Sequence, residues 1–391
     1  MADRIVLNTI SYHGHGAIEN IVPELTARGY KKAFVCSDPD LIKFGVTGKI
    51  TALLDAASFP YAVYSEIKPN PTIQNVQDGV AAFKAAEADC IVTIGGGSSM
   101  DTAKSIGIIV ANPSFADVRS LEGVADTKNK SIPIFAVPTT AGTAAEVTIN
   151  YVITDAEKNR KMVCVDPHDI PVVAFVDPDM MSSMPKGLTA ATGMDALTHA
   201  VEAFIGRSTT PYTRKMVRQA VQLIHDNLLE AYEHGDDMRA RRNMLSAAYK
   251  AGVAFTRSYV GYVHAIAHSL GGRYGIPHGL ANAIILPHML RAYGEAAAPK
   301  LADLARMAGI VPVNAQDSLA AEAFIDWIDC MNEILGIPKY VSGIRRSDIP
   351  EMAAHADAEA NPLYPVPLLM DRLELERMYE VVAGGMFEDE N

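Results

Sequence analysis

The chain has 391 residues, of which 49% are hydrophobic and 20% charged, and its formal net charge is −12 at pH 7. This length exceeds the usual size of one hydrophobic core, so two domains of ordinary globular composition are expected. The acidic balance, without a clustered stripe of Lys and Arg, argues against a nucleic-acid partner, and no apolar stretch is long enough to predict a membrane span.

The N-terminal residues and the cysteines indicate the compartment. No basic segment precedes an apolar segment and a cleavage site, so no secretory signal is predicted. The four cysteines are widely separated, with no Cys-x-x-Cys pair, and three of them lie in or beside apolar runs. This pattern is typical of buried free thiols. We therefore expect a cytoplasmic protein with neither a membrane nor a nucleic-acid partner.

Short strand-like runs alternate with helical stretches in the first half of the chain. Residues 51–57 and 76–88 have helical patterns, the second one amphipathic. The apolar runs with strand character are 32–36, 61–64, 90–94, 134–137 and 172–176. Strands separated by helices predict a doubly wound, Rossmann-like parallel sheet with helices on both faces.

The pattern changes after Pro185, where strand-like runs become rare. Residues 189–237 and 301–335 are rich in helix-forming residues, and 237–287 reads as helices interrupted only by glycines. Residues 373–382 have the same character. We therefore expect an α/β domain at 1–184 and an all-helical domain at 185–391.

A glycine-rich turn joins a strand to a helix at residues 91–104. Gly95, Gly96 and Gly97 let a ligand approach the backbone closely, and a helix N-terminus offers free N–H groups to a pyrophosphate. The turn is neither the Gly-x-Gly-x-x-Gly fingerprint nor a P-loop, which would need a Lys-Ser/Thr pair. A tight structural turn without a ligand is the alternative interpretation.

Two other strand ends carry polar residues. Asp38 follows the strand at 32–36, where a carboxylate can accept hydrogen bonds from ribose hydroxyls and repel a 2′-phosphate, which favours NAD over NADP. The alternative for Asp38 is a cap on the next helix. Residues 138–146 are rich in hydroxyl groups and small side chains, which can line a ligand cleft or form a polar loop with a helix cap.

Acidic and histidine side chains with helical spacing occur in the second half. Asp195 and His199 are four residues apart, as are His264 and His268, so each pair projects from one helix face. His278 lies in a Pro-His-Gly turn before another helix. One carboxylate and several imidazoles suit Fe²⁺, Zn²⁺ or a similar divalent ion. Each pair alone could instead be a structural or surface pair.

Taken together, these motifs resemble the iron-containing, or group III, alcohol dehydrogenases over essentially the whole chain. The matching segments are 95–104, 138–146, 193–200, 261–268 and 277–279. The resemblance implies a dehydroquinate synthase-like fold, in which a dinucleotide-binding α/β domain precedes a helical metal-binding domain and the active site lies between them. It also implies a homodimer or a larger homo-oligomer.

The resemblance also implies roles for individual residues. Asp195, His199, His264 and His278 match the metal ligands of the family, and His268 matches a second histidine near the metal. We expect His268 to relay a proton. The positions that match dinucleotide contacts are Asp38, Asn70, Gly96, Gly97, Ser98, Thr139, Thr140, Thr143, Asn150 and Lys161.

The expected reaction is the NAD-linked interconversion of a small primary alcohol or diol and its aldehyde. An Fe²⁺ ion, or Zn²⁺ or another divalent ion, would polarise the substrate oxygen while a hydride moves to or from the nicotinamide. The first half is most similar to the lactaldehyde reductases, which suggests lactaldehyde and 1,2-propanediol as the substrate pair. The alternatives are a glycerol dehydrogenase, a dehydroquinate synthase-like cyclase and a non-catalytic NAD sensor.

Overall fold

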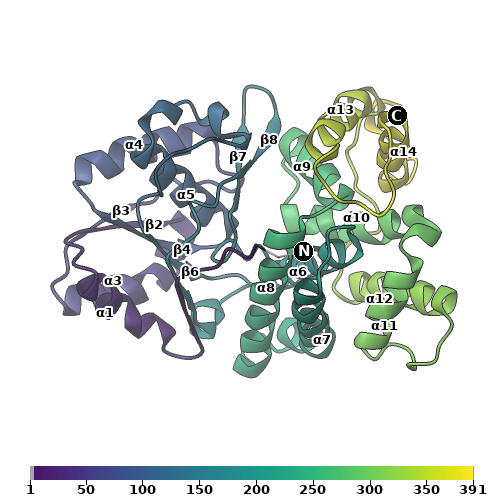
Figure 1. Cartoon of the computed structure of the whole chain (residues 1–391), viewed down its shortest axis with the longest axis horizontal. Coiled ribbons are helices and arrows are strands. Elements are labelled where there is room, and N and C mark those ends of the chain that lie inside the picture. The colour runs from purple at the N-terminus through teal and green to yellow at the C-terminus, as the bar shows by residue number, and fades with distance from the viewer. Residues whose placement is uncertain (1–3, 391) are drawn as a thin grey trace. The chain divides into compact units, whose positions relative to one another are not determined.

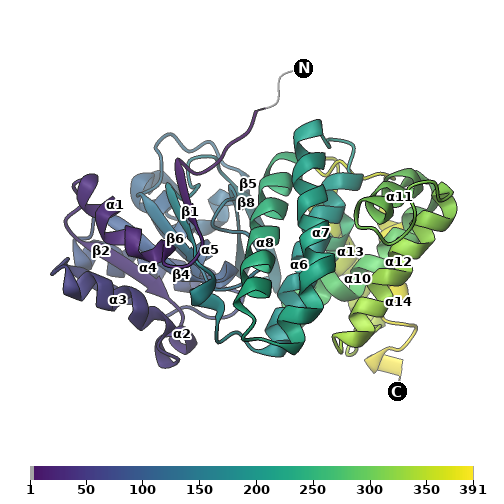
Figure 2. The same cartoon turned by 90° about the horizontal axis from the view of Figure 1, so that it is seen from below.

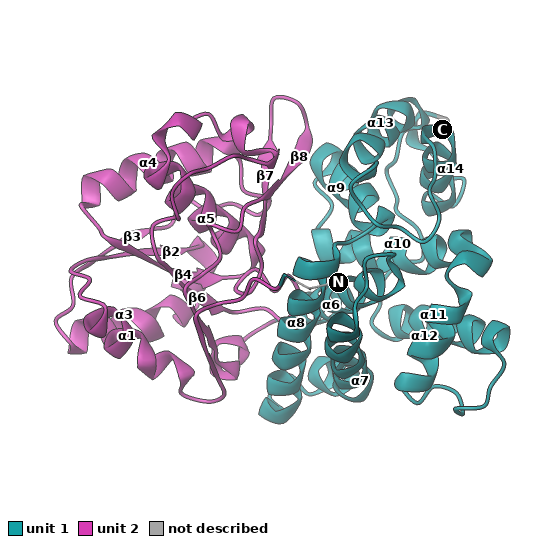
Figure 3. Cartoon of the chain, in the orientation of Figure 1, with its two compact units in different colours: residues 1–4, 185–391 teal, residues 5–184 magenta. Residues whose placement is uncertain are grey.

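A computed structural model describes residues 4–390 of the chain. The chain divides into two compact units (Figure 3). The first spans Ile5–Met184, and the second comprises Arg4 and the described residues from Pro185 onward. Each unit has its own architecture.

The unit Ile5–Met184 is built on a parallel sheet (Figure 1). Within the described residues its six strands follow the order β1-β9-β6-β4-β2-β3, and every neighbouring pair runs parallel. Their bounds are β1 Ile10–His13, β2 Ala33–Ser37, β3 Tyr61–Tyr64, β4 Cys90–Gly95, β6 Ile134–Pro138 and β9 Val173–Val176. The predicted parallel sheet is confirmed, although β1 was not anticipated.

Helices cover both faces of this sheet, as the apolar runs of the inner strands require. On one face, α1 (Ile21–Ala27) and α3 (Val46–Ala56) bury apolar side chains against β2, β4, β6 and β9. On the other face, α4 (Ile73–Ala86) and α5 (Gly97–Ala111) pack on β2, β4 and β6. Figure 1 shows the two layers on opposite sides of the strands. The doubly wound architecture is therefore confirmed.

A smaller sheet lies in the same unit and was not predicted. Strands β7 (Asn150–Asp155) and β8 (Arg160–Val165) form an antiparallel hairpin, and β5 (Gly123–Val124) pairs parallel to β8. Buried and partly exposed residues alternate along β7. The hairpin packs its buried side chains, Tyr151 and Ile153 among them, against α5 and α4.

The unit from Pro185 is helical, and the described residues 185–390 contain no strand. Figure 2 shows α6, α7 and α8 running side by side. The bounds of its helices are α6 Lys186–Ile205, α7 Pro211–Glu233, α8 Met238–Ser258, α9 Tyr262–Tyr274, α10 His278–Tyr293, α11 Ala298–Met307, α12 Asp317–Ile334, α13 Ile349–Ala360 and α14 Arg372–Val382. The predicted helical second half is confirmed.

Short elements complete the description. Helix α2 covers Pro39–Lys43 after β2. The 3-10 turns are η1 Ala17–Asn20, η2 Pro113–Phe115, η3 Val118–Leu121, η4 Pro178–Met181, η5 Gly294–Ala296, η6 Arg346–Asp348 and η7 Glu388–Glu390. Among residues 4–390, no helix combines the length and the apolar character that a membrane span needs.

Local sequence explains where several helices begin. Helix α4 begins three residues earlier than the predicted 76–88 because Thr72 and Asn75 form a reciprocal capping box at its N-terminus. The predicted helical stretch 189–237 is two helices, since the chain leaves α6 at Gly206 and Thr210 caps α7 ahead of Pro211.

Candidate active site

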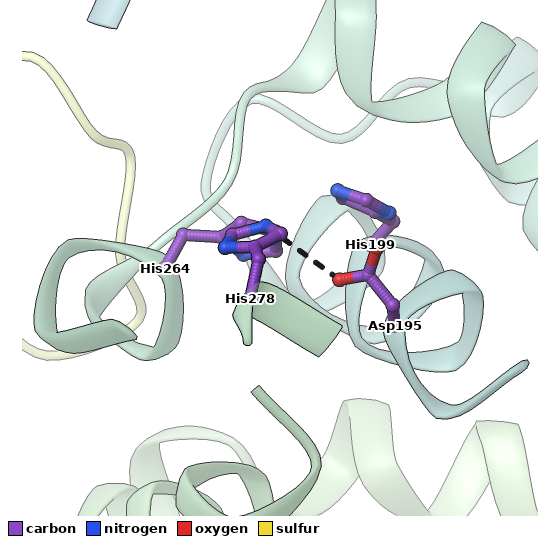
Figure 4. Close-up of side chains that lie close together, drawn as sticks. All are labelled: Asp195, His199, His264 and His278. Atoms are coloured by element: carbon purple, nitrogen blue, oxygen red, sulfur yellow. Dashed lines mark ion pairs between the residues drawn. The ribbon is translucent and has the colours of Figure 1, made fainter. Parts of the chain in front are cut away.

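Four side chains from three helices converge in the helical unit (Figure 4). Asp195 and His199 come from α6, His264 from α9, and His278 from the first residue of α10. One ligand atom from each of the four lies within 4.8 Å of the others, and all but His278 are buried. The structure thus brings the four predicted metal ligands together, which single-helix spacing alone could not guarantee.

The close approach of α10 to α6 brings His278 to the cluster. Gly279, the next residue, faces the backbone of α6, where a Cβ atom would lie 2.5 Å from the carbonyl oxygen of Ala191 and 3.3 Å from the Cβ of Asp195. Real Cβ atoms do not come this close to backbone oxygen, so only glycine fits here. The Pro-His-Gly motif therefore combines a ligand candidate with a helix contact.

Two further polar residues surround the cluster, and sequence reasoning missed both. Glu202, one turn beyond His199 on α6, accepts a hydrogen bond from the backbone N–H of Val263 and lies 2.5 Å from the Nδ1 of His264. Asn282 is fully buried on α10, and its Nδ2 donates to the Oδ1 of Asp195 at 2.7 Å. The same Nδ2 lies 3.2 Å from the Nε2 atoms of His264 and His278.

The electrostatic surroundings of His264 combine burial with negative charge. Burial alone would lower the pKa of this imidazole, but the hydrogen bond and charge of Glu202, together with the charge of Asp195, raise it above its usual value. The surroundings of His264 therefore favour positive charge.

His268 lies beside this cluster but does not join it. Its ring stacks on that of His278 with centroids 5.1 Å apart, and its Nδ1 lies 2.8 Å from the Oε1 of Glu359. The same oxygen accepts a hydrogen bond from the hydroxyl of Tyr364. Glu359 was not anticipated from the sequence, since it lies 91 residues away on α13.

The donor set fits a divalent cation. Three imidazole nitrogens and one carboxylate oxygen are the ligands that Fe²⁺ and Zn²⁺ take from proteins, at bond lengths of about 2.0–2.2 Å for zinc. Donor atoms that share one ion at such lengths lie at most about 4.4 Å apart, so atoms within 4.8 Å of one another would draw somewhat closer around it. With one carboxylate and neutral histidines, the ion would retain net positive charge.

The predicted dinucleotide contacts of the α/β unit gather at the carboxyl ends of neighbouring strands. Asp38 follows β2, Gly96–Ser98 follow β4, and Thr139–Thr140 follow β6, and these three strands are adjacent in the sheet. The chain proceeds from β2 outward to β3 on one side and from β4 outward to β6 on the other. Such a topological switch point is where open α/β sheets bind ligands.

The glycine turn is shaped by close contacts. A Cβ atom at Gly96 would lie 3.1 Å from the Oγ1 of Thr140, and one at Gly97 would lie 3.1 Å from the Cγ2 of Thr143. Gly96 is the N-cap residue of α5, and because glycine has no side chain, it places no side-chain cap over the first turn of the helix. Glycines and threonines therefore meet at a helix N-terminus, an arrangement that suits a pyrophosphate.

The remaining predicted cofactor residues lie on nearby loops and on the small sheet. Asp38 caps α2 by accepting a hydrogen bond from the backbone N–H of Leu41, so the capping interpretation is correct for at least one of its oxygens. Asn70 adopts a left-handed backbone conformation, with φ of 55°, in the loop before α4. Asn150 begins β7, and Lys161 lies on β8.

A buried lysine ties the glycine-turn helix to the small sheet. The Nζ of Lys104, on α5, donates to the carbonyl oxygens of Thr148 and Asn150 at 2.6 and 2.8 Å. Asp101, one turn earlier, accepts a hydrogen bond from the backbone N–H of Val152. Burial raises the pKa of Asp101 to about 7 and that of Glu146 to about 7, and Lys104 opposes both shifts.

Both halves of the chain match known protein families. Residues 8–178 match the family described as iron-containing alcohol dehydrogenase, and residues 189–381 match the C-terminal domain of the Fe-containing alcohol dehydrogenase family. Lactaldehyde reductase of Escherichia coli K12 is 46% identical over 358 residues, which cover 91% of this chain and 93% of that protein. The 1,3-propanediol dehydrogenase of Klebsiella pneumoniae is 41% identical over 92% of this chain and 94% of its own.

Solved structures of similar fold extend this relationship. A 1,3-propanediol oxidoreductase superposes with a TM-score of 0.92 at 38% identity, over 98% of this chain and all of the other. Sulfoacetaldehyde reductase from Bifidobacterium kashiwanohense, solved in complex with NAD⁺, superposes with a TM-score of 0.84 at 26% identity, over 99% of this chain and all of the other. The chain therefore belongs to the iron-containing alcohol dehydrogenase family, and this membership makes it an oxidoreductase of alcohols or aldehydes and implies a divalent metal ion.

Proposed function

We propose that the chain is an NAD-linked dehydrogenase that interconverts small primary alcohols or diols and their aldehydes at a divalent metal ion held by Asp195, His199, His264 and His278. The observation that carries this proposal is the convergence of these four side chains, from three helices, within 4.8 Å. When bound, the ion supplies a Lewis acid for the substrate oxygen.

The protein contributes charge and orientation around that ion. Asp195 would offset part of the charge of a bound ion, and Asn282 donates a hydrogen bond that holds its carboxylate. The buried positions of Asp195, His199 and His264 keep bulk water away from three of the four donors. In such a setting, charge that develops on the substrate oxygen interacts more strongly with the site than it would in water.

His268 is the proposed proton relay of this site. The Oε1 of Glu359 lies 2.8 Å from the Nδ1 of His268. With the proton of the neutral ring on Nδ1, this contact would fix the ring and leave Nε2 to take a proton from the substrate hydroxyl or to return it. The ring stacks on the metal-ligand candidate His278, so it lies close to the reacting atoms.

The α/β unit is proposed to bind NAD through Asp38, Asn70, Gly96, Gly97, Ser98, Thr139, Thr140, Thr143, Asn150 and Lys161. The glycine cradle at the N-terminus of α5 and the switch point between β2 and β4 support this assignment. The NAD⁺ complex of the related sulfoacetaldehyde reductase supports it as well. The preference for NAD over NADP rests on the carboxylate of Asp38.

Lactaldehyde and 1,2-propanediol are the proposed substrate pair. The 46% identity to a lactaldehyde reductase supports this choice, whereas 41% identity to a 1,3-propanediol dehydrogenase makes the neighbouring diol the closest alternative. The use of Fe²⁺ in preference to Zn²⁺ and a homodimeric or larger assembly stay predictions.

The test is NADH oxidation by the full chain, stripped of metal and reloaded with Fe²⁺ under anaerobic conditions. Lactaldehyde is compared with propanal, which has the same carbon chain without the 2-hydroxyl group. We expect turnover that a chelator abolishes and that is faster with lactaldehyde. His199→Ala should lose metal and activity by more than the roughly 10–100-fold that follows loss of an outer-shell partner, whereas His225→Ala, on α7 outside the cluster, should retain both.

The outcomes separate the chemistry from the substrate. Faster turnover of propanal would retain the dehydrogenase and reject lactaldehyde as its preferred substrate. If no aldehyde is reduced although metal and NADH are both bound, the dehydrogenase proposal is wrong.

A further inference from the structure

Glu202 is a buried carboxylate with two hydrogen-bond partners on α9. It is 3% exposed, and its Oε1 accepts a hydrogen bond from the backbone N–H of Val263 at 2.9 Å. Its Oε2 lies 2.5 Å from the Nδ1 of His264. The carboxylate is enclosed so tightly that a Cβ atom at Gly261 would lie 2.8 Å from Oε1.

The position of Glu202 on α6 relates it to the candidate ligands. Residues 195, 199 and 202 follow the spacing of a single helix face. One face of α6 thus carries Asp195 and His199, and through Glu202 it also contacts His264 of the same cluster.

We propose that Glu202 is a positioning residue that holds His264 in the tautomer with its proton on Nδ1, and that it thereby determines how tightly the cluster binds a metal ion. This inference rests on the proposed function, because it takes the cluster to be the metal site. Nothing in the sequence motif assigned a role to Glu202.

The hydrogen-bond inventory of the two side chains supports this tautomer. An ionised carboxylate only accepts hydrogen bonds, so the partner of Oε2 is an Nδ1–H group. The Nε2 of the neutral ring then carries a lone pair, and it faces the cluster, where the donor Nδ2 of Asn282 lies 3.2 Å away. A metal ion requires that same neutral ring and lone pair.

Glu202→Gln tests the role of the carboxylate with almost no change in volume. A glutamine has one acceptor oxygen for two donors, the Val263 N–H and the His264 Nδ1–H. If the oxygen stays with Val263, the amide N–H donates to Nδ1, which moves the ring proton to Nε2 and blocks the ligand atom. If the oxygen turns to His264, two N–H groups face each other at Val263.

Glu359→Gln is the matched control. The Oε1 of Glu359 likewise lies 2.8 Å from the Nδ1 of a histidine on α9, but that histidine is His268, which lies outside the four-residue cluster. If removing any carboxylate charge beside α9 weakened zinc binding, both variants would bind zinc more weakly. If zinc binding depends on the proton at the Nδ1 of His264, only Glu202→Gln binds more weakly.

The experiment measures the Zn²⁺ affinity of the full chain by competition with a chromophoric chelator. We expect Glu202→Gln to bind about 10–100-fold more weakly than wild type and Glu359→Gln to bind as wild type does. Equal affinity of wild type and Glu202→Gln would overturn the inference. If wild type itself binds no zinc, or if His264→Ala binds as well as wild type, the proposed metal site fails instead.

A second measurement does not depend on the variant folding. The ¹⁵N resonances of the imidazoles in the metal-free wild-type chain report which nitrogen of His264 carries the proton. At a pH high enough to leave the ring neutral, a proton on Nδ1 is the expected result. A neutral ring with its proton on Nε2 would overturn the inference even if Glu202→Gln were too unstable to study.

Discussion

At the scale of single residues, the geometry of the candidate metal site depends on Gly279 as well as on the four candidate ligands. Gly279 allows α10 to lie against the backbone of α6 at the point where His278 and Asp195 approach each other. The Oδ1 of Asp195 and the Nε2 of His278 are 3.7 Å apart, a separation that one shared ion can span. A side chain at residue 279 would push α10 away from α6 and so increase this distance.

Gly279→Ala is expected to weaken metal binding and to destabilise the fold. The new methyl group would lie 2.5 Å from the carbonyl oxygen of Ala191, and a backbone atom cannot move aside as a flexible side chain can. Overpacking of this kind costs about 1–3 kcal/mol. Thermal unfolding and zinc competition measure the two effects.

Gly187→Ala is the control for this substitution. Gly187 also lies in the helical unit, near the start of α6, but a Cβ atom there meets nothing within 4 Å. Alanine at this position should leave metal affinity unchanged. A Gly279→Ala variant that binds zinc as tightly as Gly187→Ala would show that the contact between α6 and α10 does not set the ligand geometry.

At the scale of elements, α5 is joined to the β7–β8 hairpin by buried charge. Lys104 donates to backbone oxygens at the start of β7, and Asp101 accepts from Val152 within that strand. Glu146 and Asp169 are buried near the same ammonium group and favour its charged form. Burial opposes that form and lowers the pKa of Lys104 overall.

Lys104→Met should destabilise the chain by about 3–5 kcal/mol, the cost of breaking a buried charge pair. The loss should be larger at pH 8 than at pH 6. The folded-state pKa values of Asp101 and Glu146, about 7, are above their ordinary values, so stability falls as pH rises through them. Removal of the ammonium group raises both pKa values further and extends that fall to higher pH.

Thermal unfolding at the two pH values checks this prediction. Lys84→Met, at an exposed position near the end of α4, is the control and should change stability little at either pH. A Lys104→Met effect that is equal at pH 6 and pH 8 would contradict the buried-charge explanation.

The elements also show which parts of the fold the sequence could predict. The strands β2, β4, β6 and β9 are buried along their length, so they appear as continuous apolar runs. Edge strand β1 is only partly buried and four residues long, which gives no comparable run. The β7–β8 hairpin has an alternating pattern that the search for apolar runs passed over, although period-two alternation could have revealed it.

In the candidate site, too, residues close in sequence could be predicted to lie together, whereas contacts between distant helices could not. Asp195 and His199, or His264 and His268, are recognisable because helix geometry fixes neighbours four residues apart. The contact of Glu202 with His264 spans 62 residues, and that of Glu359 with His268 spans 91. Such contacts depend on how helices pack, so spacing within one helix could not predict them.

At the scale of the whole molecule, two units with different architectures carry the two proposed binding functions. The parallel sheet and the N-terminus of α5 suit a dinucleotide, whereas α6, α9 and α10 gather the side chains for a metal ion. The dehydrogenase reaction requires both. In that reaction, we propose that Asp195, His199, His264 and His278 hold the catalytic ion.

The most direct test of this claim is anomalous X-ray diffraction from crystals of the Fe²⁺-loaded chain, with data collected on both sides of the iron absorption edge. One anomalous peak is expected within bonding distance of all four side chains, about 2.0–2.2 Å from the nitrogen and oxygen donors, as for zinc. An iron peak elsewhere in the molecule, with none among these residues, would contradict it.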